Sequence, residues 1–129
     1  MMEFKKSGVA AILTLHCLAS FAGWVLFEGT DEVEIYVDLS TILKNDQVAT
    51  LEYLLNFSKP QLSKGMQSAV DFAEFDCEQK RKRTLSMTNY SEPIGQGRVL
   101  FKSDEPTKWR LIRADSMEFT LWQFACKKL

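Results

Sequence analysis

The chain has 129 residues, of which 46% are hydrophobic and 26% are charged, and its formal net charge is −1. These values are typical of one globular domain and exclude a disordered or collagen-like chain. A net charge so close to zero also argues against a nucleic-acid-binding protein.

The first 22 residues have the organisation of a secretory signal peptide. Lys5 and Lys6 precede an uncharged apolar run that starts at Gly8, in the order in which the charged and apolar regions of a signal occur. Small residues at Ser20 and Ala22 predict cleavage after Ala22. We therefore expect a signal peptide over residues 1–22 and a single mature domain over residues 23–129.

Two alternatives for this leader stay open. An apolar run of about 20 residues is long enough to cross a bilayer, so the first alternative is a leader that is not cleaved and serves as a membrane anchor. Residues 24–27, however, fit the first strand of the domain better than a membrane span. The second alternative is lipidation at Cys17, although His16 stands where a lipoprotein signal has a small side chain.

The cysteines predict one disulfide. Loss of the signal removes Cys17 and leaves Cys77 and Cys126, and an even pair in an oxidising compartment is typical of a structural bridge. A bond between the two closes a loop of about 49 residues, which contributes roughly 4 kcal/mol in the chain-entropy model.

Most of the mature chain has the period-2 alternation of antiparallel strands. We expect strands over residues 24–27, 33–38, 48–57, 67–77, 80–87, 98–102 and 109–113, with polar turns at 44–47, 58–65, 89–97 and 104–107. The strands 33–38 and 48–57 are expected to form a hairpin. The capping side chains between Asp38 and Thr41 predict a single helical turn. In the strand 67–77, the residues expected to face the core are Ala69, Ala73, Phe75 and Cys77.

The last segment changes to helical spacing. Asp115 is placed to cap a helix, and Glu118 stands three residues later, as in a capping box. We expect an amphipathic helix over residues 116–127 that packs on the sheet, with Cys126 near its end bonded to Cys77. The apolar residues that define this spacing are Met117, Leu121, Phe124 and Ala125.

The mature chain shows no recognisable catalytic or metal-binding motif. The only histidine, His16, lies in the leader, so the mature domain has no histidine to act as a general base or zinc ligand. An acidic stretch is formed by Asp71, Glu74, Asp76 and Glu78, of which the last three share one strand face. We expect this face to be solvated, with an acid–base pair or a calcium site as the alternatives. We expect no enzymatic activity, no metal and no cofactor.

The densest basic run is a candidate partner-binding patch formed by Lys80, Arg81, Lys82 and Arg83. Because the chain is expected to be exported, we interpret this run as a contact for an acidic glycan, lipopolysaccharide or an acidic protein rather than for nucleic acid. The alternative is an edge strand that its cations keep soluble. The three tryptophans are expected to serve core packing rather than a binding platform.

The order and spacing of these features resemble the surface-adhesin protein E family of small bacterial envelope domains. The resemblance covers essentially the whole mature chain, and its most specific stretch runs from Ser68 to Asp76. It continues through Cys77, Arg81, Arg83, Leu85, Tyr90-Ser91, Trp109 and Cys126. The resemblance implies an α+β fold: an antiparallel sheet of about six strands, with a C-terminal helix packed on it and tethered by a disulfide.

The resemblance also implies export and, for the family's namesake, adhesion to host extracellular-matrix and serum proteins such as laminin and vitronectin. This chain lacks a clear lipobox, so outer-membrane anchoring is not carried over. We expect an exported, non-enzymatic, adhesion-like module in the periplasm or on the outer cell surface, which binds a protein or an envelope component. The alternative is a periplasmic structural or accessory protein that pairs through a free sheet edge, for example as a homodimer.

Overall fold

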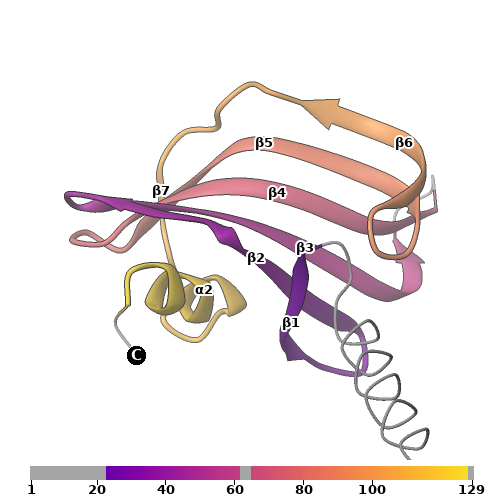
Figure 1. Ribbon diagram of the computed structural model, residues 1–129, viewed down its shortest axis with the longest axis horizontal. Coiled ribbons are helices and arrows are strands. Elements are labelled where there is room, and N and C mark those ends of the chain that lie inside the picture. The colour runs from indigo at the N-terminus through magenta and orange to yellow at the C-terminus, as the bar shows by residue number, and fades with distance from the viewer. Residues whose placement is uncertain (1–22, 62–64, 128–129) are drawn as a thin grey trace, which may run out of the picture.

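A curved antiparallel sheet makes up most of the fold (Figure 1). The computed structural model describes residues 23–61 and 65–127, so the predicted signal peptide and Cys17 lie outside the described residues. Six strands pair in chain order: β1 (Trp24–Gly29), β2 (Val33–Asn45), β3 (Val48–Gln61), β4 (Met66–Asp76), β5 (Arg81–Glu92) and β6 (Gln96–Ser103). A short seventh strand, β7 (Arg110–Leu111), pairs with the start of β5. The predicted antiparallel sheet is confirmed.

The hairpin between β2 and β3 is confirmed, but the helical turn predicted over residues 38–41 is wrong. Both strands are longer than expected, and β2 continues to Asn45. The ladder is irregular between Asp38 and Leu43. There the Thr41 hydroxyl donates to the carbonyl of Asp38 at 2.6 Å and accepts from the backbone N–H of Glu52 at 2.8 Å. The polar side chains that suggested helix capping therefore bridge a bulge within the sheet.

The concave face of the sheet carries the core. Alternate residues of β2, β3 and β4 point to this face because successive side chains of a strand point to opposite sides. The predicted inward residues of β4 are buried, and Cys77 follows them at the end of the strand. The core residues are Ile35, Val37, Ala49, Leu51, Tyr53, Ala73, Phe75, Cys77, Ile112, Leu121, Trp122, Ala125 and Cys126.

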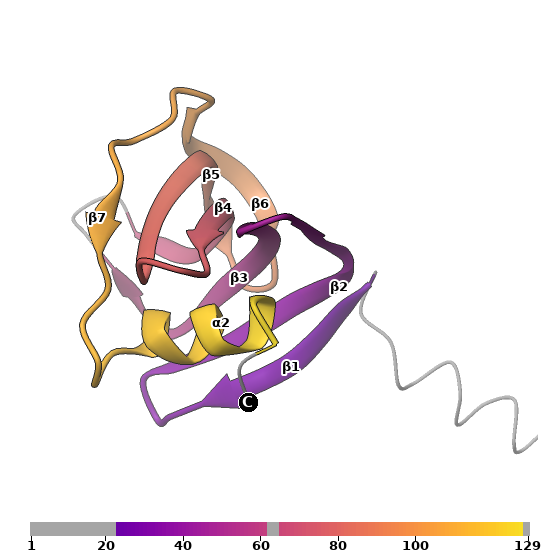
Figure 2. The same cartoon turned by 90° about the vertical axis from the view of Figure 1, so that its left-hand side faces the viewer.

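The C-terminal helix, α2 (Met117–Ala125), covers this concave face (Figures 1 and 2). Its N-cap is Ser116, whose side chain accepts from the backbone N–H of Phe119, so the prediction of Asp115 as the cap is wrong. Leu121, Trp122 and Ala125 form its buried side. Within the residues that the structure describes, no helix is long and apolar enough to cross a membrane.

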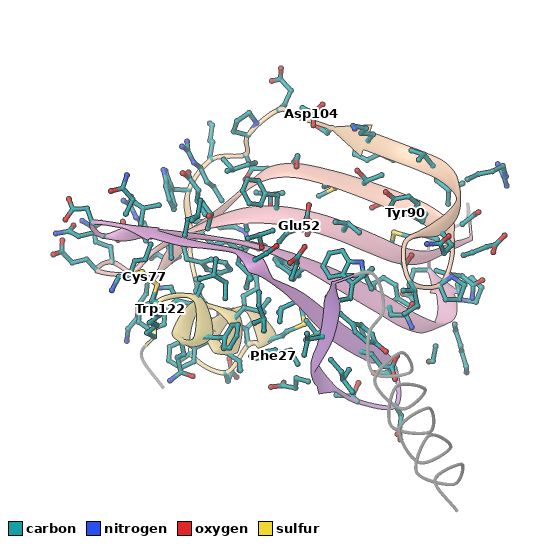
Figure 3. The ribbon with its side chains drawn as sticks, viewed as in Figure 1. Phe27, Glu52, Cys77, Tyr90, Asp104 and Trp122 are labelled. Carbon is teal, nitrogen blue, oxygen red and sulfur yellow. A yellow bond between two sulfur atoms is a disulfide. The ribbon has the colours of Figure 1, made fainter. Side chains whose placement is uncertain are left out.

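The disulfide between Cys77 and Cys126 is present and joins the end of β4 to the C-cap of α2. Figure 3 shows Cys77 beside Trp122 at the end of the sheet where the β2–β3 and β4–β5 turns lie. The bond ties the helix covalently to the same strand on which it packs. The fold class expected from the sequence is therefore confirmed, with the helix tethered as predicted.

The later strands differ from the prediction mainly in their ends. β5 runs to Glu92 and β6 starts at Gln96, so the turn between them is limited to residues 93–95, whereas a turn over residues 89–97 was expected. The last strand is limited to Arg110–Leu111 instead of residues 109–113. The β5–β6 turn folds over the convex face, where the backbone N–H of Gly95 donates to the Ser68 hydroxyl at 2.9 Å.

Candidate binding surface

The basic run does not form a single patch, because the strand alternation divides it between two faces. Arg81 and Arg83 point to the convex face, whereas Lys82 points to the concave face, where its side chain is only 5% exposed. Lys80 precedes β5, and its ammonium nitrogen lies 5.7 Å from the ring centroid of Phe119 and 5.8 Å from that of Trp122. All four cations of the candidate patch therefore contact other groups of the domain.

On the convex face, Arg81 and Arg83 flank the ring of Trp109. The guanidinium carbons lie 5.3 Å and 4.9 Å from the ring centroid, at distances typical of cation–π contacts. Each arginine also pairs with an acid of β4: Arg81 with Asp76 at 2.8 Å and Arg83 with Glu74 at 2.6 Å. We call these five residues the arginine–tryptophan strip. Its arginines keep about a third of their side chains exposed, 35% and 34%.

On the concave face, Lys82 takes part in a buried ion network between the sheet and the helix. Its ammonium group lies 2.9 Å from a carboxylate oxygen of Glu118, which also accepts from the guanidinium of Arg110. Burial alone raises the pKa of Glu118, but the hydrogen bonds from Arg110 and Lys82 outweigh burial and leave the pKa lowered. Glu118 is therefore ionised at neutral pH and links α2 to β5 and β7.

Asp71 lies beside this network in a less favourable environment. The Tyr53 hydroxyl donates to one of its carboxylate oxygens at 3.3 Å. The other oxygen is buried without a partner among the described residues. Burial raises the pKa of Asp71 and outweighs the opposing effects of Lys82 and the Tyr53 hydrogen bond.

The four acidic residues lie in different surroundings and are not arranged as an acid–base pair or a metal site. Glu74 and Asp76 pair with arginines, Asp71 faces the core side, and Glu78 is exposed in the β4–β5 turn. In the described ranges, no three side chains of the metal-binding types gather within reach of one ion. Glu74 and Asp76 share the convex face as expected, but Asp76 is only 8% exposed and Glu78 lies in the turn beyond β4.

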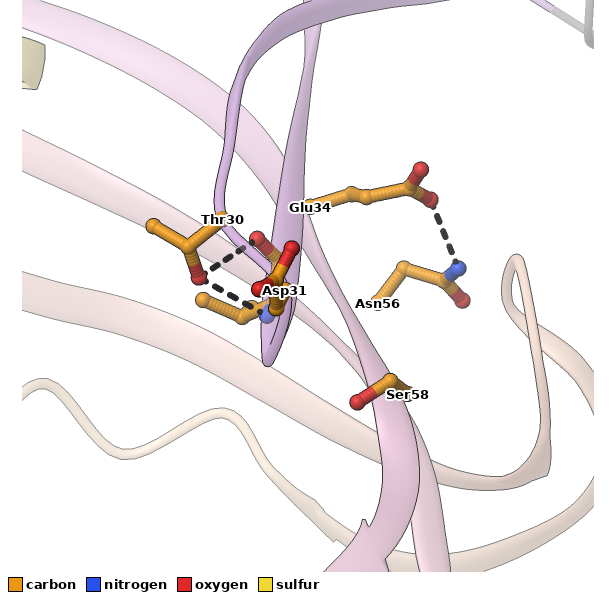
Figure 4. A pocket seen from close by; sticks show the side chains of 6 residues that line it. Thr30, Asp31, Glu34, Asn56 and Ser58 are labelled. Atoms are coloured by element: carbon orange, nitrogen blue, oxygen red, sulfur yellow. Dashed lines mark hydrogen bonds between the residues drawn. The ribbon is translucent and has the colours of Figure 1, made fainter.

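Two hollows lined by residues that the structure describes are small. One of about 210 Å³ is lined by residues of the β1–β2 turn, β2 and β3, namely Thr30, Asp31, Val33, Glu34, Asn56 and Ser58 (Figure 4). Another of about 180 Å³ lies between β5, Phe101, Ser103 and residues 105–107. Sites for small organic ligands commonly have volumes of about 300–1,000 Å³. These two hollows are smaller than such a site.

Charge separates strongly across the sheet. Residues 23–57, which form β1, β2 and most of β3, contain seven acidic residues and one basic residue, a net charge of −6. Residues 80–113, which form β5, β6 and β7, contain nine basic and three acidic residues, a net charge of +6. Because the strands pair in chain order, these charges lie at opposite margins of the sheet. The overall charge of −1 conceals this polarity.

The basic margin ends in an open strand edge. Within the described residues, β6 pairs with β5 on one side and with no strand on the other. Val99 and Phe101 are 55% and 50% exposed on β6, and the exposed cations Arg98 and Lys102 lie next to them in sequence. The interpretation of the sequence missed this edge, although the spacing of apolar and basic residues in 98–102 carried the signal.

Comparison with known proteins agrees with this fold. The family model for surface-adhesin protein E matches residues 24–127. Crystal form II of Haemophilus influenzae protein E superposes with a TM-score of 0.61 at 16% identity, covering 84% of this chain and 91% of that chain. Protein E from non-typeable Haemophilus influenzae gives a TM-score of 0.57 at 15% identity, with coverages of 84% and 78%. No curated protein sequence matches this chain.

Proposed function

Because the chain belongs to the surface-adhesin protein E family, we propose that it binds an acidic segment of a host or envelope protein through the basic margin of its sheet. Membership of this family supports an adhesin-like module that is exported or lies on the cell surface. We propose further that the mature domain acts by binding alone, without catalysis, on the outer cell surface or in the periplasm. The family match favours this function over an accessory protein that pairs through its sheet edge.

The observation that carries the proposal is the concentration of positive charge beside an open strand edge. An extended segment of a partner is able to add to β6 through main-chain hydrogen bonds, as in other cases of strand addition. Arg98 and Lys102 then lie next to the added strand, so an acidic segment gains charge complementarity. Val99 and Phe101 supply exposed apolar surface to the same contact.

The candidate patch Lys80–Arg83 has a different role in this proposal. Its cations already pair or stack within the domain, so they contribute mainly to the positive field that attracts the partner. Arg81 and Arg83 are half-exposed and extend the basic margin along the convex face. We therefore expect direct contacts from β6 and longer-range attraction from this run.

The test is a binding measurement with the protein purified after export. Laminin and vitronectin, immobilised separately, are probed with the unmodified protein and with the variant Lys102→Glu. Saturable binding is expected, with a reduction of roughly 5-fold or more in Lys102→Glu and a decline as salt rises. Lys44→Glu makes the same charge change at the exposed end of β2 on the acidic side of the sheet and is expected to bind normally.

Absence of saturable binding to matrix proteins and to isolated envelope components would refute an adhesive function. Equal losses in Lys102→Glu and Lys44→Glu would leave adhesion standing but refute the assignment to the basic margin. Circular dichroism of each variant confirms that the sheet is intact before binding is compared.

A further inference from the structure

Two carboxylates on the convex face lie beside the position where the mature chain is expected to begin. Asp38 of β2 is the Cα partner of Trp24 in β1 and of Glu52 in β3. Gly23 directly precedes Trp24. Gly23 thus lies beside Asp38, and Glu52 is the next residue across the sheet.

The carboxylate of Asp38 lies against Gly23. Its Oδ1 accepts from the backbone N–H of Ser40 at 3.0 Å and from the Ser40 hydroxyl at 2.6 Å. A Cβ built on Gly23 would lie 3.7 Å from Oδ2 of Asp38. The nitrogen of Gly23 is about 2.5 Å from such a Cβ by covalent geometry, so it lies within about 6 Å of Oδ2.

The two carboxylates lack a compensating cation in the part of the chain that the structure describes. Neither pairs with a lysine or arginine there, and Oδ2 of Asp38 accepts no hydrogen bond from the described residues. The next residues in the same cross-strand row are the uncharged Phe72 and Ser86. Burial raises the pKa of Glu52, and the negative charge of Asp38 raises it further.

We propose that cleavage after Ala22 creates an ammonium group at Gly23, and that this group pairs with Asp38 and Glu52. Removal of the leader then supplies a cation to the two carboxylates of the convex face. Hydrolysis by a signal peptidase breaks the Ala22–Gly23 amide. Water supplies the hydroxyl of the new Ala22 carboxyl group and a proton to the Gly23 nitrogen, which takes a further proton from solvent at neutral pH. Before cleavage the same nitrogen is a neutral amide, and the two carboxylates have no cation beside them among the described residues.

The pairing has a defined electrostatic consequence. An α-amino group in a peptide has a pKa of about 7.7–8.0. The Asp38 carboxylate within about 6 Å favours its charged form and raises its pKa, and the more distant Glu52 acts in the same direction. The folded pKa of the group then exceeds the unfolded pKa, so its contribution to stability is complete below about pH 7.7 and is lost as pH rises through the folded value. This inference depends on export and cleavage, but not on the identity of any binding partner.

The experiment titrates the amino group of the exported protein. The full chain is produced with its own leader in bacteria that export it, and mass spectrometry identifies the first residue. Glycine labelled with ¹³C then reports the ionisation of Gly23 by NMR between pH 6 and 10. We expect Gly23 as the first residue and a pKa above the ordinary range by roughly half a unit or more.

Three variants separate this pairing from a general effect of charge. Asp38→Asn is expected to return the pKa of the amino group to its ordinary range, and Glu52→Gln to lower it in part. Glu28→Gln removes an exposed carboxylate from β1 and is expected to change nothing. A different first residue, an ordinary pKa in the unmodified protein, or a pKa that Asp38→Asn does not alter would overturn the inference. None of these outcomes bears on adhesion, which the binding measurement tests separately.

Discussion

The indole N–H of Trp122 donates a hydrogen bond of 2.8 Å to the backbone carbonyl of Asp76, across 46 residues of sequence. Asp76 ends β4, and its carboxylate accepts from the backbone N–H groups of Glu78 and Gln79 and from Arg81. One residue therefore fixes the β4–β5 turn through its side chain and the helix through its backbone. The disulfide at the adjacent Cys77 joins the same two elements.

The first prediction concerns this hydrogen bond. Trp122→Phe keeps an aromatic ring on the buried side of α2 but leaves the carbonyl of Asp76 without its donor. A buried acceptor that loses its partner costs about 1–3 kcal/mol, so the free energy of unfolding in urea should fall by that amount or more. Trp24→Phe is the matched control, because the half-exposed Trp24 side chain donates no hydrogen bond within the described residues. Equal effects of the two substitutions would contradict the assigned role.

Removal of the disulfide should destabilise the domain without changing its sheet. Loop closure over the 49-residue separation of Cys77 and Cys126 corresponds to roughly 4 kcal/mol, within a usual range of about 2–5 kcal/mol for small secreted domains. The variant Cys77→Ala with Cys126→Ala is compared with the oxidised protein by urea unfolding. A reducing agent should lower the midpoint of the oxidised protein only. Insensitivity of that midpoint would show that the bond contributes nothing.

The buried network between sheet and helix should show strong coupling. Glu118→Gln leaves the buried Lys82 without its ionised partner, and breaking a buried pair in this way typically costs about 3–5 kcal/mol. Lys82→Met combined with Glu118→Gln should cost less than the sum of the single changes, because the buried Lys82 charge is removed together with its partner and only the exposed Arg110 loses a contact. Glu28→Gln, an exposed control, should stay within about 0.5 kcal/mol of the unmodified protein. Additive losses would mean that the pair does not interact.

Two aspartates of β4 should affect the pH dependence of stability with opposite signs. Burial alone raises the pKa of Asp76, but hydrogen bonds from Arg81, Gln79 and Glu78 outweigh it and leave the pKa below the ordinary value of 3.8. Its contribution to stability is therefore present above about pH 4 and lost as pH falls through the folded pKa. Asp71 has a raised pKa because of burial, so its charged form disfavours the folded state at neutral pH.

Urea unfolding between pH 2.5 and 7.5 checks both signs. Asp76→Asn should lower stability at pH 7 and reduce the loss on acidification. Asp71→Asn should raise stability at pH 7, and its advantage should vanish at low pH, where Asp71 is protonated in the unmodified protein. If both variants shifted the profile in the same direction, the assignment of these two environments would be wrong.

A substitution at Gly97 should be costlier than one at another glycine with a similar backbone. Gly97 has φ +84, and a Cβ there would lie 2.8 Å from Cγ of Glu92, which is too close for any side chain. Gly65 has φ +74, but a Cβ there meets nothing within 4 Å. Gly65→Ala should cost about 1 kcal/mol from backbone strain alone, and Gly97→Ala should cost more. Thermal unfolding of the two variants measures the difference.

The sequence predicted the fold well because local alternation is strong in this chain. Small and apolar residues recur at every second position at the end of β4, and Cys77 and Cys126 permit only one bridge between them. The same alternation could have separated Lys82 from Arg81 and Arg83. Its partner Glu118, however, lies 36 residues away, and a pairing at that distance depends on where the helix packs.

The errors also have local causes. Asp38, Ser40 and Thr41 are residues of the kind that cap helices, but the same hydroxyl and carboxylate groups also satisfy the backbone at a bulge. Asp115 and Ser116 are adjacent residues that are both capable of capping, and the geometry of the chain entering α2 selects Ser116. The basic margin was missed because the net charge of the chain gives no positions. Only the order of the strands shows that the basic residues gather on one side of the sheet.

The bridge between Cys77 and Cys126 also determines how the domain would respond to a pulling force. Residues 77–126 form a covalent ring that contains β5, β6, β7 and α2. Tension applied at the N-terminus is able to peel away β1, β2, β3 and then β4, all of which precede the ring. The strands of the basic margin thus lie inside the loop that the disulfide closes. The residues of this loop cannot be extended by the pulling force while the disulfide is intact.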